Sequence, residues 1–307
     1  MKLSEAIKTF IAARQVSQKT REHYRIVFAS FPPDLLATEL SQVTIGQLRA
    51  WSNLVRQRPG QRLDVSSPNG HTAITAATHH YYLRNCQTLF NWFVGEGLLP
   101  VSPAARLEKP QLPKVPAKGI SDENLTRLLE AAQRSRRPFS QRDYALVRFL
   151  ADTGCRSGGA AGLLLEDLDL KNKRALVYEK GRGGQKKARL VYYGQRTADA
   201  LRAWLIERDP GLDAQTVFVG RTRQPLTGNG INHLFRRLAI QGRVAGRANP
   251  HSLRHAWARR ALQNGLDLGA VSQVLGHSSI RVTHQFYAFY DEGDLPDRHS
   301  LGRLADD

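Results

Sequence analysis

Apolar residues recur at helical spacing through the first hundred residues of the chain. Leu3, Ile7, Phe10 and Ile11 lie three and four positions apart, so a helix places them on one face. Similar spacing predicts three more helices, which are Thr20–Ser30 behind the cap Ser17, a short helix after Thr44, and Ala73–Glu96, stopped by Gly97. Pro32 and Pro33 break the chain between the second and third helices. A helical first domain is therefore predicted.

A proline-rich segment separates this domain from the rest of the chain. Residues 100–118 contain five prolines, and proline fixes φ and disfavours helix in the residue before it. A semi-extended linker is expected, and its basic residues suit either a plain spacer or a segment running along DNA. We predict a helical domain over 1–105, a linker over 106–118 and a second domain over 119–307.

The second domain combines helical patterns with one pair of strands. Residues 174–180 and 188–193 are rich in β-formers and are joined by a glycine-rich turn, which predicts a hairpin. Helices are predicted from Ser121 through Ala132, and over Asp143–Ala151, Thr197–Arg208, Asn229–Gln241, Ser252–Asn264 and Leu268–Leu275. The fold class is therefore mainly α, with an α+β second domain that holds a small antiparallel sheet.

The charge balance narrows the choice of partner. The 45 Lys and Arg residues against 27 Asp and Glu give a net charge of +18. Such an excess attracts polyanions, and contacts with phosphates release counterions, so nucleic acid is the favoured partner. Cys86 and Cys155 are far apart and belong to no metal-ligand cluster, which favours a reducing, cytoplasmic setting without structural zinc. No run of eighteen apolar residues and no signal peptide are seen, so no membrane association is expected.

Several residue clusters could carry chemistry, although each has a structural reading on its own. Arg156 follows a glycine turn in TGCR, and His251 and Arg254 share a helix face at a spacing of three. A guanidinium binds two phosphate oxygens at once, and imidazole transfers protons. Lys180 stands at the hairpin tip, and His277 precedes Tyr287 by ten residues. Taken one at a time, they can be read as a surface arginine, a chance His-x-x-Arg match, a solvated lysine, a helix cap and a core tyrosine. We expect His255 to point elsewhere and to pack or hydrogen-bond structurally.

The order of these clusters resembles the tyrosine recombinase, or phage integrase, family. The matching strings are TGCR with LLLEDLDL, YEKGRGGQKKARLVYY, HSLRHAWARRAL, VLGHSSI and VTHQFY, and the resemblance covers essentially the whole chain. It implies that Arg156 and Arg254 clamp the scissile phosphate and that Lys180 protonates the leaving 5′ oxygen. It further implies that His251 assists proton transfer, His277 hydrogen-bonds the phosphate and Tyr287 attacks phosphorus.

The resemblance also implies an architecture and partners. The first domain would be a helical core-binding (SAM-like) domain, and the two domains would form a C-shaped clamp around double-stranded DNA. The enzyme would be a site-specific recombinase or integrase that works through a 3′-phosphotyrosyl intermediate and a Holliday junction. It would act as a homotetramer on two DNA sites, with accessory directionality proteins as further partners. Basic stretches such as Arg134–Arg142 and Arg236–Arg247 would follow phosphates. No metal or cofactor is expected, because the cationic cluster neutralises the phosphorane and covalent linkage conserves bond energy.

Three departures from the family pattern leave alternatives open. Family members usually have an acidic residue three after the first arginine, where this chain has Gly159. The hairpin turn is longer than usual, which makes Lys186 or Lys187 an alternative to Lys180. The tyrosine falls one residue late, so Tyr290 competes with Tyr287 as nucleophile. A binding-only relative and a type IB topoisomerase are the rival functions.

Overall fold

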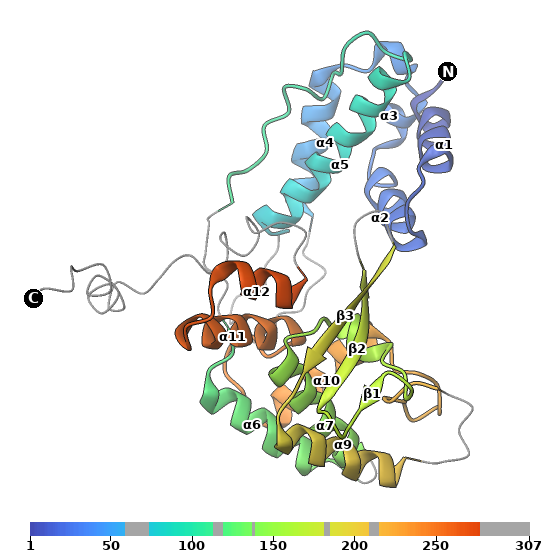
Figure 1. Ribbon diagram of the computed structural model, residues 1–307. Coiled ribbons are helices and arrows are strands. Elements are labelled where there is room, and N and C mark those ends of the chain that lie inside the picture. The colour runs from blue at the N-terminus through green and yellow to red at the C-terminus, as the bar shows by residue number, and fades with distance from the viewer. Residues whose placement is uncertain (59–73, 113–118, 137–138, 181–184, 209–214, 277–307) are drawn as a thin grey trace, which may run out of the picture. The chain divides into compact units, whose positions relative to one another are not determined.

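The computed structural model describes residues 1–58, 74–112, 119–136, 139–180, 185–208 and 215–276. The chain divides into two compact units, Met1–Lys114 and Val115–Asp307 (Figure 1). The described part is mostly helical with one small antiparallel sheet, which confirms the predicted fold class. In this part, no helix combines the length and the apolar character that crossing a bilayer requires.

The first unit is a bundle of helices around an aromatic core. Its elements are α1 (Leu3–Ala13), α2 (Gln18–Phe28), α3 (Pro33–Ala37), a 3-10 turn (Leu40–Gln42), α4 (Ile45–Gln57) and α5 (Ala76–Gly95). The ring of Phe31 meets the indole of Trp51 edge-on at 4.7 Å, and the indole N–H donates to Ser30 Oγ at 2.9 Å. The buried tryptophan is thus both packed and hydrogen-bonded, as a polar group in a core must be.

The proline pair in this unit does more than break the chain. Pro33 is the first residue of the short helix α3, where its missing N–H costs nothing because the first amides of a helix lack intrahelical partners.

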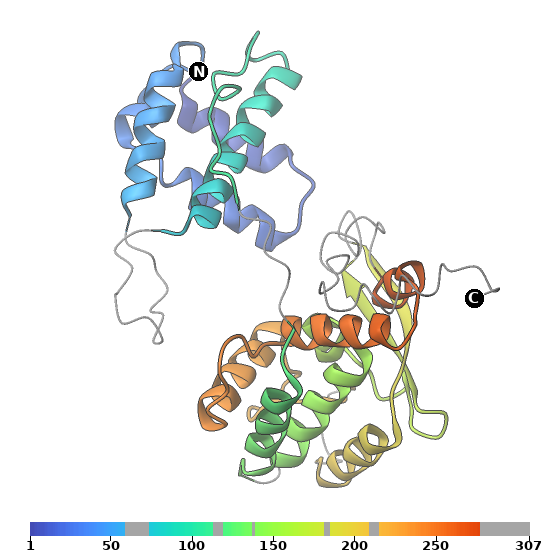
Figure 2. The same cartoon turned by 90° about the vertical axis from the view of Figure 1, so that its left-hand side faces the viewer.

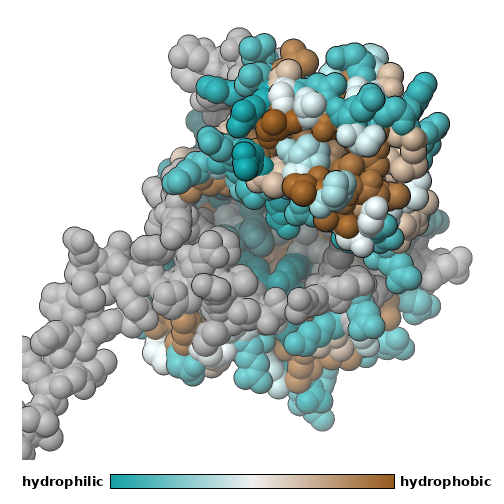
Figure 3. Space-filling view, turned by 90° about the horizontal axis from the view of Figure 1, so that it is seen from above, coloured by the Kyte–Doolittle hydropathy of each residue, from teal (hydrophilic) through white to brown (hydrophobic). Residues whose placement is uncertain are grey.

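Exposed apolar side chains also occur on this unit, including Leu98 and Val101. Figure 3 shows apolar residues gathered between polar ones on the face of this unit that the view presents.

The second unit places helices around a three-stranded sheet. Its helices are α6 (Asp122–Gln133), α7 (Phe139–Thr153), α8 (Ser157–Ala161), α9 (Gln195–Glu207), α10 (Gly228–Gln241), α11 (Pro250–Gln263) and α12 (Leu268–Leu275). Figure 2 shows α12 and the hairpin at one end of this unit and α9 at the other. The main core cluster includes Leu146, Phe149, Trp204 and Phe235, all nearly fully buried, and a smaller cluster lies between α11 and α12.

The sheet differs from the predicted hairpin in two respects. Its strands β1 (Leu168–Asp169), β2 (Arg174–Lys180) and β3 (Lys186–Tyr192) pair antiparallel in that order. The second hairpin strand begins at Lys186 rather than at residue 188, because Lys180 pairs with Lys186 and the ladder continues into the polar residues. The short strand β1 was not predicted, since two residues carry no recognisable alternation.

The start of the second unit is fixed directly on α11. The amide of Ile120 donates to the carbonyl of Ser252 at 3.2 Å. A Cβ on Gly119 would lie 2.7 Å from the backbone nitrogen of Ala256, so only glycine allows this close approach of two backbones.

Candidate active site

Helix α11 carries two of the predicted site residues and is firmly capped. Asn249 accepts a hydrogen bond from the Ser252 amide at 2.9 Å, and Ser252 Oγ accepts one from the Asn249 amide at 3.0 Å. Pro250 occupies the first turn, so the helix begins two residues before the predicted start at Ser252. His251 and Arg254 therefore lie within one helix at the spacing of three that the sequence suggested.

Arg254 is buried beneath the site, with 2% of its surface exposed. Its Nη1 donates to the carbonyl of Gly154 at 2.8 Å, and its Nη2 donates to the carbonyl of Leu275 at 2.5 Å. A guanidinium with several fixed donors suits such bridging. Arg254 thus connects the turn before Arg156 to the end of α12.

Arg156 stands at the N-cap of α8 after a left-handed glycine turn. Gly154 has φ +58°, and a Cβ there would meet Trp257 and Leu275 at 3.1–3.2 Å, so the turn requires glycine. The amide of Arg156 donates to Glu179 Oε1 at 2.6 Å, and its Nη1 donates to Glu179 Oε2 at 2.5 Å. The Arg156 side chain remains 36% exposed, so it can meet a ligand from solvent.

The two histidines of α11 contact each other. The rings of His251 and His255 meet edge-on at 4.9 Å, so the prediction that His255 points elsewhere was wrong. The spacing of four, which puts two residues on one helix face, was the overlooked signal. Burial lowers the pKa of His251, and the charges of Arg254 and Arg156 lower it further. The lower pKa favours the neutral imidazole, which is the form that can accept a proton.

The hairpin residues are partly described. Lys180 is the last residue of β2 and pairs through its backbone with Lys186 across the hairpin; the structure describes neither side chain. The neighbouring Lys187 is exposed. The choice among these three lysines therefore remains as the sequence left it.

The remaining predicted residues lie outside the described residues. Helix α12 ends at Leu275, and Gly276 follows in the left-handed conformation with φ +64°. His277, Tyr287 and the alternative Tyr290 come after this point in the chain. The structure thus places the end of α12 beside Arg254 and leaves the tyrosine register as a prediction.

Two charged residues of the hairpin were missed by the sequence reasoning. Glu179 is 4% exposed and accepts hydrogen bonds from Arg156 and from Arg189 Nη2, the latter at 2.9 Å. Arg189 Nη1 also donates to the carbonyl of Val274 in α12. The signal for Glu179 was the alternation of β2, because Ala175 and Val177 are buried and 179 falls on the same face.

The prediction that the stretch Arg134–Arg142 follows phosphates was wrong for Arg142. Arg142 is buried, and its Nη2 donates to Asp143 Oδ1 at 2.6 Å, while its Nη1 donates to the carbonyl of Val219. Arg237 pairs with the same carboxylate from α10. A charge run in sequence cannot separate solvated arginines from those that neutralise a buried acid. Arg236, Arg243 and Arg247 are exposed and stay available for phosphate.

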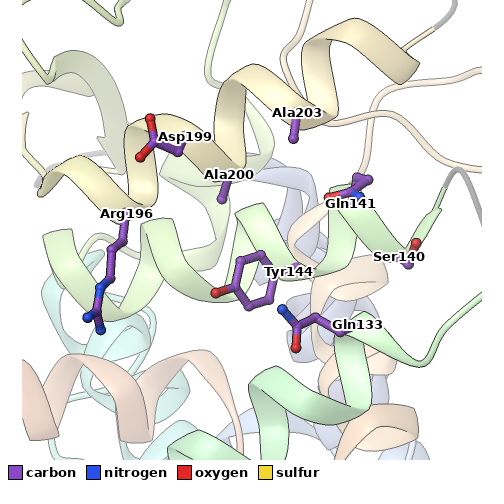
Figure 4. A pocket seen from close by; sticks show the side chains of 8 residues that line it. All are labelled: Gln133, Ser140, Gln141, Tyr144, Arg196, Asp199, Ala200 and Ala203. Carbon is purple, nitrogen blue, oxygen red and sulfur yellow. The ribbon is translucent and has the colours of Figure 1, made fainter.

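A pocket of about 500 Å³ lies elsewhere in the second unit. Figure 4 shows its lining from α6, α7 and α9, which consists of Gln133, Ser140, Gln141, Tyr144, Arg196, Asp199, Ala200 and Ala203. The arginines of the candidate site do not line it, so we assign the chemistry to the α8, α11 and hairpin residues instead.

The chain is similar to known proteins over nearly all of its length. Residues 118–292 match the model of the phage integrase family. Tyrosine recombinase XerC of Xanthomonas campestris pv. campestris (strain B100) is 30% identical over 294 residues, which cover 93% of this chain and 84% of that protein. Tyrosine recombinase XerC of Thermodesulfovibrio yellowstonii is 29% identical over 216 residues, which cover 68% of this chain and 70% of that protein.

Solved structures share the fold. The Tn1549 transposon integrase in complex with a circular intermediate DNA has a TM-score of 0.74 and 18% identity, covering 98% of this chain and 99% of that one. A lambda integrase dimer bound to a core site has a TM-score of 0.68 and 19% identity, covering 92% and 97% of the two chains. These structural likenesses concern the fold, whereas the family model and the XerC relative at 30% identity establish the family: the chain belongs to the phage integrase family of tyrosine recombinases.

Proposed function

We propose that this protein is a site-specific DNA recombinase that breaks and rejoins strands through a 3′-phosphotyrosyl intermediate. The observation that carries the proposal is that Arg254 joins the turn before Arg156 to the end of α12, with His251 three residues before Arg254 in the same helix. Two guanidiniums and an imidazole suit a phosphodiester, because fixed cations stabilise the charge that develops on a pentacovalent phosphorus. The XerC relatives, named as tyrosine recombinases, support the same chemistry.

The reaction consists of two balanced transesterifications. The hydroxyl oxygen of Tyr287 attacks phosphorus and loses its proton, with His251 assisting the transfer. The bond from phosphorus to the 5′ oxygen breaks, and Lys180 donates a proton to that leaving oxygen. Arg156, Arg254 and His277 stabilise the phosphoryl oxygens meanwhile. A 5′ hydroxyl of a partner strand then displaces the tyrosine, so no external energy source is consumed.

The assembly follows from two successive strand exchanges. We propose that the first unit is a core-binding domain and that both units close around double-stranded DNA as a C-shaped clamp. Exchange between two sites passes through a Holliday junction and requires four active sites, so a homotetramer is the working form, with directionality proteins as accessory partners. The related Tn1549 integrase is in complex with circular intermediate DNA and the lambda integrase dimer is bound to a core site, which supports DNA as the substrate. The free cysteines Cys86 and Cys155 suit the reducing cytoplasm as the place of action.

A nicked suicide substrate tests the proposal. The cognate site is first selected from bound fragments of host DNA, and a nick near the cleavage point then traps the covalent product. We expect a protease-sensitive protein–DNA adduct whose modified peptide carries DNA on Tyr287. Tyr287→Phe should abolish the adduct, and Tyr290→Phe is the matched control that should preserve it.

Other outcomes separate the rival functions. DNA found on Tyr290 keeps the mechanism and changes the nucleophile. Specific binding without any adduct contradicts catalysis and favours a binding-only relative. Relaxation of supercoiled plasmids that lack a specific site contradicts a recombinase and favours a type IB topoisomerase.

A further inference from the structure

Strand β2 sends a carboxylate into the candidate site that the mechanism above does not use. Glu179 immediately precedes Lys180, and only 4% of its side chain is exposed. It accepts three hydrogen bonds, from the Arg156 amide at 2.6 Å, from Arg156 Nη1 at 2.5 Å and from Arg189 Nη2 at 2.9 Å. Both carboxylate oxygens are therefore occupied by cationic or amide donors.

The environment keeps this buried carboxylate ionised. Burial alone raises the pKa of Glu179, but Arg189, the amide and guanidinium of Arg156, and Arg254 together outweigh it and hold the pKa below its usual value. A buried charge persists only where partners compensate for lost hydration. Replacing the carboxylate would leave the guanidiniums without this compensation.

The space for Glu179 is provided by a glycine on the facing helix. A Cβ on Gly159 of α8 would lie 3.1 Å from Glu179 Cγ and 3.4 Å from its Oε1. At Gly158, one residue earlier in the chain, a Cβ would meet nothing within 4 Å. A side chain at 159 and the carboxylate of Glu179 would therefore compete for one volume, whereas position 158 is unconstrained in this way.

The same carboxylate reaches the end of α12 through Arg189. Arg189 donates from Nη2 to Glu179 and from Nη1 to the carbonyl of Val274. Arg254 binds the next carbonyl, that of Leu275. The last turn of α12, which leads into His277, is thus held by two arginines, one of which is itself oriented by Glu179.

We propose that Glu179 is a positioning residue of the phosphate-binding site, where it orients Arg156 and, through Arg189, fixes the end of α12. This assignment rests on the proposed function of the site. Arg156 donates from Nη1 to Glu179 while its side chain stays 36% exposed, so the carboxylate fixes the orientation of a guanidinium that a phosphate can reach from solvent. Gly159 is the matching requirement, because it leaves room for the acid that comes from β2.

The test removes the carboxylate from Glu179 on β2 and supplies it from position 159 on α8. Glu179→Gln removes the charge while preserving shape, and Glu179→Ala removes the group. Gly159→Glu alone crowds two acids into one space. The double variant Gly159→Glu with Glu179→Ala supplies the acid from α8 instead. Asp169→Asn is the control, since Asp169 pairs with Arg174 in the same sheet but outside the site.

We expect a slower rate of adduct formation when the carboxylate is removed, and a partial recovery when it is supplied from position 159. At saturating suicide substrate, Glu179→Gln should slow adduct formation about 10–100-fold, the usual effect of removing a group that orients an active-site residue. Its affinity for DNA should stay within about threefold of the parent, because the arginines remain. The double variant should regain at least tenfold over Glu179→Ala, and Asp169→Asn should cleave like the parent.

Two results would overturn the assignment. One is Glu179→Gln cleaving at the parental rate. The other is a double variant that melts at the parental temperature but regains no activity, which would reduce Glu179 to a purely stabilising role. If Glu179→Ala does not fold, Glu179→Gln and the double variant compared with the parent decide the question.

A second readout separates this proposal from the proposed function. The ¹⁵N resonance of Arg156 Nε can be identified by its loss in Arg156→Lys. Without any DNA present, its relaxation should report an ordered Nε–H group in the parent and a mobile one in Glu179→Gln. An unchanged resonance overturns the positioning role even if the parent forms no adduct. A parent that forms no adduct overturns the proposed function instead.

Discussion

Arg254 combines a structural task with a chemical one. It is buried and donates to backbone carbonyls from two separate segments, at Gly154 and Leu275. Loss of the Arg254 side chain would leave both carbonyls without these hydrogen bonds in a buried place, which is costly. It would therefore disturb the turn before Arg156 and the end of α12 together. The residue is therefore expected to affect cleavage through geometry as well as through its charge.

His255 makes the folded protein sensitive to acid. Burial, followed by the influence of His251 and Arg254, lowers its pKa from 6.5 to about 4. Between these values the unfolded chain binds the proton more readily, so stability is complete above pH 6.5 and falls as the pH drops toward 4. After allowance for the partial exposure of the ring, the loss should be about 1–2 kcal/mol.

Urea unfolding at pH 7 and pH 5 measures this effect. His255→Gln, which does not titrate, should show a smaller decrease in unfolding free energy than the parent over this range. Equal decreases in the two proteins would contradict the assignment of the acid sensitivity to His255.

The sequence predicted single residues well where a motif fixes them and poorly where a partner comes from another element. His251 and Arg254 follow from a helix with a spacing of three, and that helix is present. Glu179 was missed because its role depends on a contact across 23 positions with Arg156, which no local pattern contains. Arg142 was misjudged for the same reason, since its guanidinium donates to the carbonyl of Val219, 77 positions away.

At the scale of elements, the capping of α11 should affect the chemistry. Asn249→Ala removes the acceptor for the Ser252 amide and should cost about 1 kcal/mol of stability. Fraying of the first turn would displace His251, so the rate of adduct formation should fall severalfold. Calorimetry and single-turnover cleavage measure the two effects.

Helix α4 provides the matched control for this cap. Thr44 and Gln47 form an equivalent capping box in the first unit. Thr44→Ala should lower stability by a similar amount, about 1 kcal/mol, while the rate of cleavage on saturating DNA stays parental. Equal effects of the two substitutions on cleavage would show that general stability, and not the cap of α11, sets the rate.

The end of α12 depends on a glycine for two reasons. Gly276 has φ +64°, and a Cβ there would lie 3.3 Å from Arg189 Cδ. Gly276→Ala should therefore cost about 1 kcal/mol for the left-handed conformation and also displace Arg189 from Val274.

Gly246→Ala separates these two contributions. Gly246 has φ +75° with open space around its Cβ position, so alanine there carries the backbone cost alone. We expect both variants to melt below the parent and only Gly276→Ala to cleave more slowly. A parental cleavage rate for Gly276→Ala would contradict the role assigned to this end of the helix.

Most of the predicted helices lie within three residues of their observed ends, although α7 begins four residues before the predicted Asp143. Helix α12 has the predicted bounds Leu268–Leu275, and α10 begins one residue earlier than predicted. Strand β1 and helix α3 escaped prediction because two to five residues hold too little pattern. Their formation depends on pairing with β2 and on packing of Leu35, which are tertiary effects.

At the scale of the whole molecule, the net charge of +18 should dominate affinity for DNA. If six to ten phosphates are contacted, binding should weaken about a thousandfold to a hundred-thousandfold between roughly 50 and 200 mM salt. Arg236→Ala removes one exposed cation and should reduce the slope of log K against log salt by about 1. Fluorescence anisotropy over a salt series measures the slope.

Arg202→Ala is the control for this series. Arg202 is exposed on α9, at the end of the second unit remote from α12 (Figures 1 and 2), and pairs with Asp199. Its removal should leave the slope unchanged. An equal change in both variants would show that the cation at 236 acts only through the total charge.

The contact of Gly119 and Ile120 with α11 has a mechanical consequence. The backbone that enters the second unit from the proline-rich segment is bonded to Ser252 and pressed against Ala256, on the same helix that carries His251 and Arg254. A displacement of Gly119 and Ile120 would therefore be passed directly to the helix of the reactive groups rather than to a remote surface.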